Sequence, residues 1–319
     1  MNGALIIDKP AGMTSHDIVA RLRRITGERR AGHTGTLDPF ATGVLVVLLG
    51  RATRLAQFLS GAEKEYEAVI RFGYSTDTGD ITGTRVNSEA HVTRKTPQSL
   101  SKHEIEAAMT SLTGEIGQIP PMYSAKKVDG RKLYEHARRG ETIDRPPVRI
   151  TIREFQLLSE NIDREANEDA TADIRVRVVC SAGTYVRTLA EDLGKQLGTG
   201  AHLTELRRMR AGRFGLEHSI TLEKLADHAD NATIENVLIS PYNAVSHLPA
   251  LALDEDDDKR VLNGIDVRIA DGPARGWADE QAIRLSVGED LLAVGLYKAG
   301  EGLVHPHVVI KQQNARNES

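Results

Sequence analysis

The sequence lacks the features that mark secreted, disulfide-bonded or membrane proteins. A single cysteine, Cys180, excludes an internal disulfide and any metal site built from several thiolates. No stretch approaches the roughly 20 consecutive apolar residues of a membrane helix, and residues 1–9 lack the basic and apolar regions of a signal peptide. We therefore expect a cytoplasmic protein that does not associate with a membrane.

Motifs for cofactors and metals are also missing. The chain contains no G-x-x-x-x-G-K-[ST], no H-E-x-x-H and no C-x-x-C. Residues 254–258 form an acidic run, but neighbouring side chains cannot all converge on one ion, so a solvated charged segment is expected there. The sequence thus predicts a protein with no metal and no cofactor.

Charge is unevenly distributed along the 319 residues, which carry a net charge of −4. Residues 1–60, 121–158 and 173–215 each contain four more Lys and Arg than Asp and Glu, whereas residues 216–258 contain one basic and ten acidic residues. The basic segments include the candidate motifs described below. This pattern favours a positive, nucleic-acid-facing surface on an acidic body.

One carboxylate stands out because of its surroundings. The stretch 32–43, GHTGTLDPFATG, places Asp38 in a loop of glycine and small residues before the apolar run 44–49. Pro39 restricts the backbone of Asp38, and a loop attached to a buried strand is rigid enough to position a reacting group. An Asp before Pro is also a common turn residue, so the residues alone leave both interpretations open.

The pattern of apolar residues predicts an α+β fold with a mixed, mainly antiparallel sheet. Strands are expected near 4–8, 44–49, 64–73, 148–158 and 173–180, and helices near 15–27, 51–60, 101–112, 131–139 and after Gly183. Ser15 is the expected N-cap of the first helix. Beyond about residue 250 the pattern changes to short strands, so we expect two domains, 1–248 and a small β-rich domain 249–319.

Motifs spread over nearly the whole chain resemble, in the same order, those of the TruB-type pseudouridine synthases. They are residues 8–15, 32–43, 64–66, 77–80, 119–125, 180–187 and 200–208. The resemblance implies isomerisation of uridine to pseudouridine at position 55, in the T arm of tRNA, without a cofactor. It also implies an RNA-clamping insert at about 120–148 and a C-terminal domain similar to a PUA domain, an RNA-binding module.

The resemblance also assigns roles to residues. Asp38 corresponds to the nucleophile, Arg187 to its charged partner, and Tyr66 to the ring that stacks on the flipped uracil. His33 corresponds to a group that binds or flips the RNA. Further substrate-binding positions are Lys9, Asp80, Tyr185 and Leu206. In the insert, Lys126 and Lys127 are candidates to contact phosphates, and a solvated basic helix face is an equally good interpretation of either residue.

Other functions are compatible with parts of this pattern. The chain could be an RNA-binding folding factor with incidental or lost catalysis, but the intact set of Asp38, Tyr66 and Arg187 favours an active enzyme. A metal-dependent nuclease lacks clustered ligands. An RNA-guided synthase subunit is not favoured by the resemblance, so we expect a monomer with tRNA as its partner and no obligatory protein partner.

Overall fold

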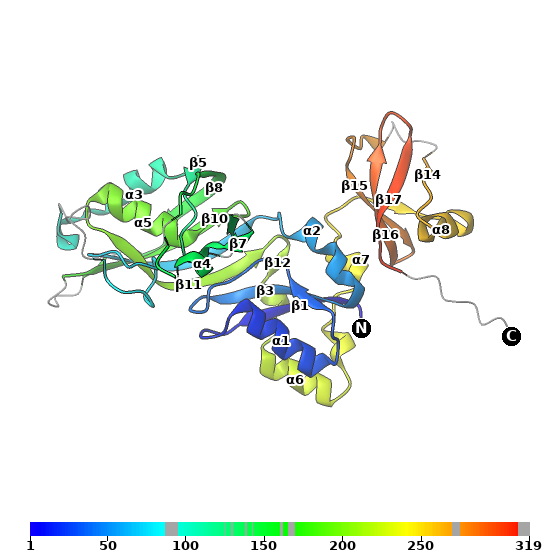
Figure 1. Ribbon diagram of the computed structural model, residues 1–319, viewed down its shortest axis with the longest axis horizontal. Helices are drawn as coiled ribbons and strands as arrows, with labels where there is room; N and C mark the ends of the chain where they lie inside the picture. Colours follow the sequence, from blue (N-terminus) through cyan, green and yellow to red (C-terminus); the bar gives the residue numbers. More distant parts are fainter. Residues whose placement is uncertain are drawn as a thin grey trace.

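The computed structural model describes residues 1–86, 95–124, 126–128, 130–137, 139–141, 143–159, 162–164, 170–269 and 275–311. Within them the chain forms two β-sheets flanked by helices, with a small hairpin in the insert (Figure 1). The predicted α+β class is confirmed. No helix in these residues has the length and apolar character needed to cross a membrane.

The larger sheet contains ten strands and is mixed but mainly antiparallel, as predicted. Its central order is β1-β3-β11-β4-β10-β8-β5, and β3 and β11 are the parallel neighbours. The strands are β1 (Gly3–Lys9), β2 (Ala31–His33), β3 (Thr42–Leu49), β4 (Lys64–Phe72), β5 (Gly114–Gln118), β8 (Val148–Leu157), β9 (Asp163–Arg164), β10 (Ala172–Cys180), β11 (Ala201–Ala211) and β12 (Phe214–Gly215).

Helices cover the two halves of this sheet differently. One face of β1 and β3 packs on α1 (Ser15–Thr26) and α6 (Leu222–Asp230), and the opposite face packs on α2 (Ala56–Leu59) and α7 (Pro241–Ala244). In the other half, α3 (Lys102–Ser111) and α5 (Val186–Leu197) cover one face of β4, β10 and β8 (Figure 1). The N-terminus of α5 carries Arg187, which lines the cleft described below.

Strand β4 shows how the second half separates a buried face from a polar one. Tyr66, Ala68, Ile70 and Phe72 are buried in the core under α5, because alternate residues of a strand point to the same face. The intervening positions are charged except for Val69, and Glu65 and Arg71 pair across strands, the latter with Asp173 on β10. The functional cleft described below opens on the same face as Tyr66.

The first helix begins differently from the prediction. Thr14 is the N-cap of α1 and forms a capping box with Asp17, so the expectation that Ser15 caps this helix was wrong. Ser15 is buried and its hydroxyl instead bonds both the N–H (2.8 Å) and the carbonyl (3.1 Å) of Leu37. The predicted capping box of Ser101 and Glu104 at α3 is confirmed.

The insert and the C-terminal region form separate small units. The insert contains β6 (Lys127–Val128), β7 (Arg131–Lys132) and α4 (Leu133–Ala137). The C-terminal sheet has the order β13-β15-β16-β17-β14 and its own apolar core, which confirms a β-rich C-terminal domain. Its elements are β13 (Ala250–Ala252), α8 (Glu255–Leu262), β14 (Val267–Arg268), β15 (Ala282–Val287), β16 (Asp290–Lys298) and β17 (Leu303–Val309).

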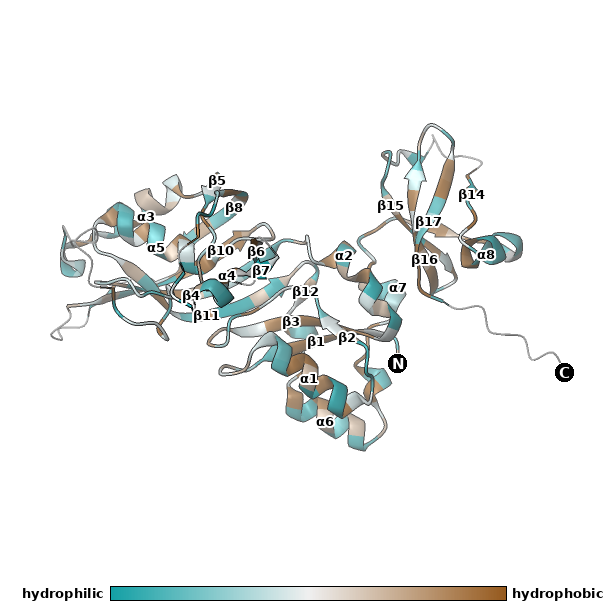
Figure 2. Cartoon of the chain, in the orientation of Figure 1, coloured by the Kyte–Doolittle hydropathy of each residue, from teal (hydrophilic) through white to brown (hydrophobic). Residues whose placement is uncertain are grey.

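The C-terminal domain is held to the first domain near α2 and α7 (Figure 1). Arg51 and Arg54, which precede α2, donate hydrogen bonds to the carbonyls of Ile310 (3.2 Å) and Val309 (2.6 Å). The acidic run 254–258 lies in the first turn of α8 and its N-cap, and Figure 2 shows this helix as mainly hydrophilic. Asp254 and Asp256 are exposed, as expected for a solvated run, whereas Asp257 and Asp258 are partly buried.

Candidate active site

A polar cleft lies where the 32–43 loop, the start of β4 and the N-terminus of α5 meet. Its volume is about 250 Å³, which is small beside the roughly 300–1,000 Å³ of pockets for drug-sized ligands. The cleft therefore has room for one small planar group such as a nucleobase. It is lined by Thr34, Gly35, Thr36, Leu37, Asp38, Ser60, Lys64, Tyr66, Ser124, Ser181, Gly183, Thr184, Tyr185, Val186, Arg187, Leu206 and Arg208.

The loop that carries Asp38 is fixed by contacts on both sides of this residue. Ser15 binds the backbone of Leu37, as described above, and the carbonyl of Pro39 accepts hydrogen bonds from the Gly12 N–H (2.8 Å) and the Lys9 ammonium (3.3 Å). These bonds hold the residues before and after Asp38. A carboxylate so placed meets a ligand without reorganising the loop, which is what a reacting group requires.

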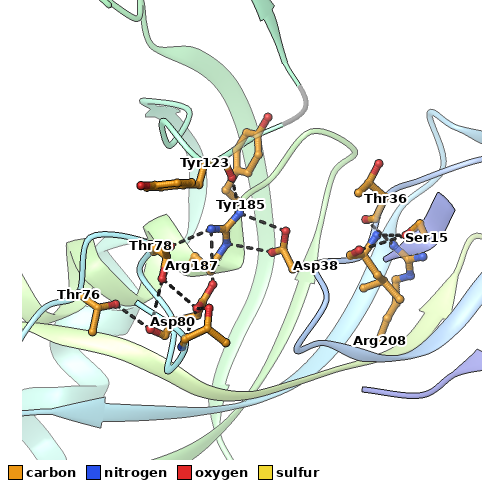
Figure 3. Close-up of polar contacts among 12 residues, drawn as sticks. Ser15, Thr36, Asp38, Thr76, Thr78, Asp80, Tyr123, Tyr185, Arg187 and Arg208 are labelled. Atoms are coloured by element: carbon orange, nitrogen blue, oxygen red, sulfur yellow. Dashed lines mark hydrogen bonds and ion pairs between the residues drawn. The ribbon is translucent and has the colours of Figure 1, made fainter. Parts of the chain in front are cut away.

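Arg187 holds the Asp38 carboxylate in a two-point contact. Its Nε lies 2.9 Å from Asp38 Oδ2, and its Nη2 donates to Oδ1 at 3.2 Å (Figure 3). The same guanidinium donates to the carbonyls of Thr78 and Tyr123, each at 2.8 Å, and lies 3.6 Å from Asp80 Oδ2. Arg187 is only 5% exposed. Its position on α5 is therefore determined from four directions.

The surroundings of Asp38 act on its pKa in opposite directions. Burial in the cleft raises the pKa of the carboxyl, and the negative charge of Asp80 adds to this rise. The Arg187 guanidinium lowers the pKa again by charge and by hydrogen bonding. Burial is the largest of these effects, so the pKa of Asp38 lies above its ordinary value, and the two-point contact with Arg187 limits the rise by favouring the charged form.

Tyr66, Leu206 and Tyr185 form the apolar walls of the cleft. Tyr66 and Leu206 are 8% and 6% exposed and project from the neighbouring strands β4 and β11. Burial raises the pKa of Tyr66, so its hydroxyl stays protonated at neutral pH. Tyr185 is the N-cap residue of α5, where the Gln118 side-chain amide binds both its N–H (2.8 Å) and its carbonyl (3.0 Å).

Two residues predicted to bind substrate lie behind the cleft instead. Lys9 is fully buried and donates to the carbonyls of Pro10, Met13 and Pro39, so its charge is used to support the loop. Asp80 is 4% exposed and accepts bonds from Thr78 and Thr82 while it faces Arg187. Carbonyl acceptors surround Lys9, and hydroxyl and N–H donors surround Asp80, so both residues lie where they position the Asp38 loop and Arg187.

The remaining predicted positions lie outside the cleft. His33 ends β2 near the rim, its ring meets that of His16 edge-on, and burial lowers its pKa to about 4, so it is neutral at pH 7. Lys126 lies in the insert, where its carbonyl accepts a bond from the Leu133 N–H. The Lys127 side chain lies outside the described part of the structure. The insert approaches the site through Tyr123 and Ser124.

Two cations of the cleft were not singled out by sequence reasoning. Arg208 is 2% exposed and donates to the carbonyls of Val44 (2.6 Å), Gly35 (3.1 Å) and Thr36 (3.4 Å), which ties β11 to the Asp38 loop (Figure 3). Lys64, two residues before Tyr66, also lines the cleft. The alternation of β4 could have identified Lys64 from the sequence, because Lys64 lies on the same buried face of the strand as Tyr66.

The fold and the cleft together define a class of enzyme. A nucleobase-sized pocket with an arginine-held carboxylate, an aromatic wall and buried cations is suited to binding a base of RNA. In the described residues no three metal-binding side chains cluster. These features fit an RNA-modifying enzyme.

Comparison with known proteins identifies the family. Residues 23–186 match the model of the TruB family pseudouridylate synthase N-terminal domain, and residues 187–245 match that of the tRNA pseudouridylate synthase B C-terminal domain. The chain belongs to the TruB family of pseudouridylate synthases, isomerases that convert uridine to pseudouridine. The family predicted from the motifs is confirmed.

Individual relatives agree with this assignment. The chain is 46% identical to tRNA pseudouridine synthase B of Bacillus thuringiensis (strain Al Hakam) over 83% of its length and 84% of the relative. It is 45% identical to the protein of the same name from Geobacillus thermodenitrificans (strain NG80-2), over 84% of this chain and 86% of that one. A crystal structure of a Cbf5-Nop10-Gar1 complex contains a similar chain, with TM-score 0.72 and 27% identity over 97% of this chain and 85% of that chain.

Proposed function

We propose that this protein converts uridine to pseudouridine at position 55 in the T arm of tRNA, with Asp38 as the nucleophile. The observation that carries the proposal is the carboxyl group of Asp38, held by Arg187 inside a cleft of nucleobase size. The substrate is inferred from the relatives, which are named tRNA pseudouridine synthase B.

The reaction breaks the N1–C1′ bond of uridine, turns the base and joins C5 to C1′, while C5 loses a proton and N1 gains one. Atoms and electrons balance within the nucleoside, so we propose that no redox cofactor, metal or nucleotide takes part. Asp38 could attack C6 of the base, attack C1′, or act as a base in a glycal route. Each of these steps needs the carboxylate in its charged form.

The other side chains have distinct proposed roles. The target uridine must leave its stack to reach Asp38, and the Tyr66 ring and Leu206 are the surfaces against which its base would lie. Tyr185 closes the cleft at the start of α5. The exposed rim near His33 and the insert with Lys126 and Lys127 would contact the RNA outside the cleft, while Lys9 and Asp80 act through the residues they position.

The C-terminal domain, residues 249–319, is proposed to be PUA-like and to add affinity for whole tRNA from outside the catalytic centre. The described residues that line the cleft all lie between Thr34 and Arg208, which is in the first domain. We further propose that the protein works in the cytoplasm as a monomer without an obligatory protein partner.

Tritium release from an unmodified tRNA tests this function. A transcript that carries a C5 tritium label only at uridine 55 should release its label into water, because that hydrogen leaves as C5 joins C1′. The same transcript labelled at other uridines should release none. Binding of tRNA without release from either transcript would instead indicate a folding factor.

A further inference from the structure

Lys64 is a buried cation that has no carboxylate partner among the described residues. It begins β4, is 8% exposed, and donates one hydrogen bond, to the carbonyl of Ser60 at 2.6 Å. Burial, together with the positive charge of the nearby Arg208, lowers its pKa to about 8. A lysine ammonium has three donors, so this contact leaves two of them for other partners.

The cleft has two walls of different charge. On the α5 side, Arg187 faces two carboxylates, those of Asp38 and Asp80. On the β4 and β11 side, Lys64 and Arg208 bind backbone carbonyls, and Arg208 also bonds the Tyr66 hydroxyl. All of these partners are uncharged, and no ion pair of the described residues includes Lys64 or Arg208. Figure 3 shows Arg187 and Arg208 on opposite sides of Asp38. The second wall therefore carries two uncompensated positive charges.

The acidic neighbours of Lys64 in the sequence cannot neutralise it, because they project to the opposite face of β4. Glu63 pairs with Arg153 (2.5 Å) and Arg210 (2.9 Å), and Glu65 pairs with Arg177 (2.7 Å) and Arg210 (3.2 Å). Cys180, which is opposite Lys64 on β10, has its pKa raised to about 11 by burial and so remains an uncharged thiol.

A buried, unpaired lysine is destabilising for a free protein, since desolvating a charge costs several kcal/mol when no counter-charge is present. Such a group is expected where an anionic ligand supplies the counter-charge. The register of the sheet places Lys64 and Arg208 beside the Tyr66 wall: Arg208 pairs directly with Tyr66, and Lys64 lies two residues away, about 7 Å along the strand.

We propose that Lys64, with Arg208 beside it, binds a backbone phosphate of the RNA next to the nucleotide whose base enters the cleft. This rests on the proposed function, because it takes RNA as the substrate. The contact would fix the polynucleotide backbone along the β4 and β11 wall, so that the base lies against Tyr66 and its glycosidic bond faces Asp38 on the other side.

The test compares Lys64→Met with Lys64→Arg and with Lys224→Met, which removes a lysine from the exposed face of α6. Binding of a T-arm stem-loop is measured over a range of salt in the Asp38→Asn background, where no substrate is converted. Lys64→Met should weaken binding about tenfold and reduce the slope of log K against log salt by about 0.7–0.9. The other two variants should keep the slope of the unchanged protein.

Neutral phosphate analogues locate the contact. Stem-loops with a single methylphosphonate on either side of the target uridine should include one that binds the parent protein about tenfold more weakly. The Lys64→Met variant should not distinguish that RNA from the unmodified one. Melting of the free proteins should show Lys64→Met to be at least as stable as the parent, because the unpaired buried charge is gone.

Several results would overturn the inference. One is a salt slope in Lys64→Met equal to that of the parent protein. Another is a methylphosphonate that weakens RNA binding by the parent and by Lys64→Met by the same factor. A third is a loss confined to turnover, with affinity intact and an ionisation near pH 8 abolished, which would make Lys64 a proton-transfer group. Failure of the unchanged protein to bind or isomerise the stem-loop would count against the proposed function instead. Should Lys64→Met not fold, Lys64→Gln takes its place in each comparison.

Discussion

Replacing Arg187 by Gln should shift the acidic limb of the pH–rate profile to higher pH. The guanidinium contacts both oxygens of Asp38, at 2.9 Å and 3.2 Å, and stabilises the charged carboxylate. Two unit charges at 4 Å interact by about 4 kcal/mol at an effective dielectric constant of 20, which corresponds to about 3 pKa units. Because Asp38 is 32% exposed, solvent reduces this value, and we expect a rise of about 1–3 pH units.

The direction of this electrostatic effect on the pKa of Asp38 can be checked with a second substitution. The charge of Asp80 raises the pKa of Asp38, so Asp80→Asn should move the acidic limb to lower pH. Arg71→Gln is the matched control, because it removes an arginine from an equally close two-point pair, with Asp173 at 2.7 and 2.8 Å, outside the cleft. This control should leave the limb unchanged.

The assay is kcat/KM for tritium release, followed between pH 4 and pH 8, since this ratio reports ionisations of the free enzyme. Circular dichroism confirms that each variant is folded, because Arg187→Gln leaves two buried carboxylates close together. A rate loss in Arg187→Gln that is equal at every pH would refute the electrostatic account. A shift of the Arg187 and Asp80 variants in the same direction would also refute it.

Three further predictions concern the fold, the cofactor requirement and the C-terminal domain. Gly43→Ala should lower the free energy of unfolding by more than about 3 kcal/mol in denaturant titrations, because φ is +97° and a Cβ would lie 2.2 Å from the Arg208 carbonyl oxygen. Gly32→Ala, with no atom within 4 Å of the added carbon, should change it by less than about 1 kcal/mol, and equal losses would contradict the explanation. Activity should survive dialysis against EDTA, and a loss restored only by one divalent ion would show that a metal takes part. A chain ending at residue 248 should melt at a lower temperature, since it loses the contacts of Arg51 and Arg54. It should still isomerise a T-arm stem-loop but show a higher KM for whole tRNA; inactivity on saturating stem-loop, or unchanged affinity for tRNA, would count against separate roles.

The sequence predicted those parts of the structure that depend on local patterns. Alternation identified β4 and β10, the capping box identified the start of α3, and the glycine-rich loop with the apolar run after it identified Asp38 and β3. The pairing of Asp38 with Arg187, far apart in the chain, came from the resemblance to a family. No local pattern could have shown that pairing.

Contacts that depend on the register of distant strands were not predictable. Ser15 was predicted to cap the first helix. Its contact with Leu37 instead depends on how α1 packs on β1 and β3, which no local pattern shows. Lys9 and Asp80 were expected to touch substrate, but their burial depends on the 39–42 and 76–82 segments that close over them. The uncompensated charges of Lys64 and Arg208 appear only when β4, β10 and β11 are aligned.

The central claim is that the Asp38 carboxylate performs the reaction, and Asp38→Asn tests it most directly. This change keeps the shape of the side chain and removes the negative charge that a nucleophile needs. Tritium release from tRNA labelled at C5 of uridine 55 is measured beside equilibrium binding of the same tRNA. We predict that release is abolished while the tRNA still binds. Turnover by the Asn variant above a trace would contradict the assignment of Asp38 as the nucleophile.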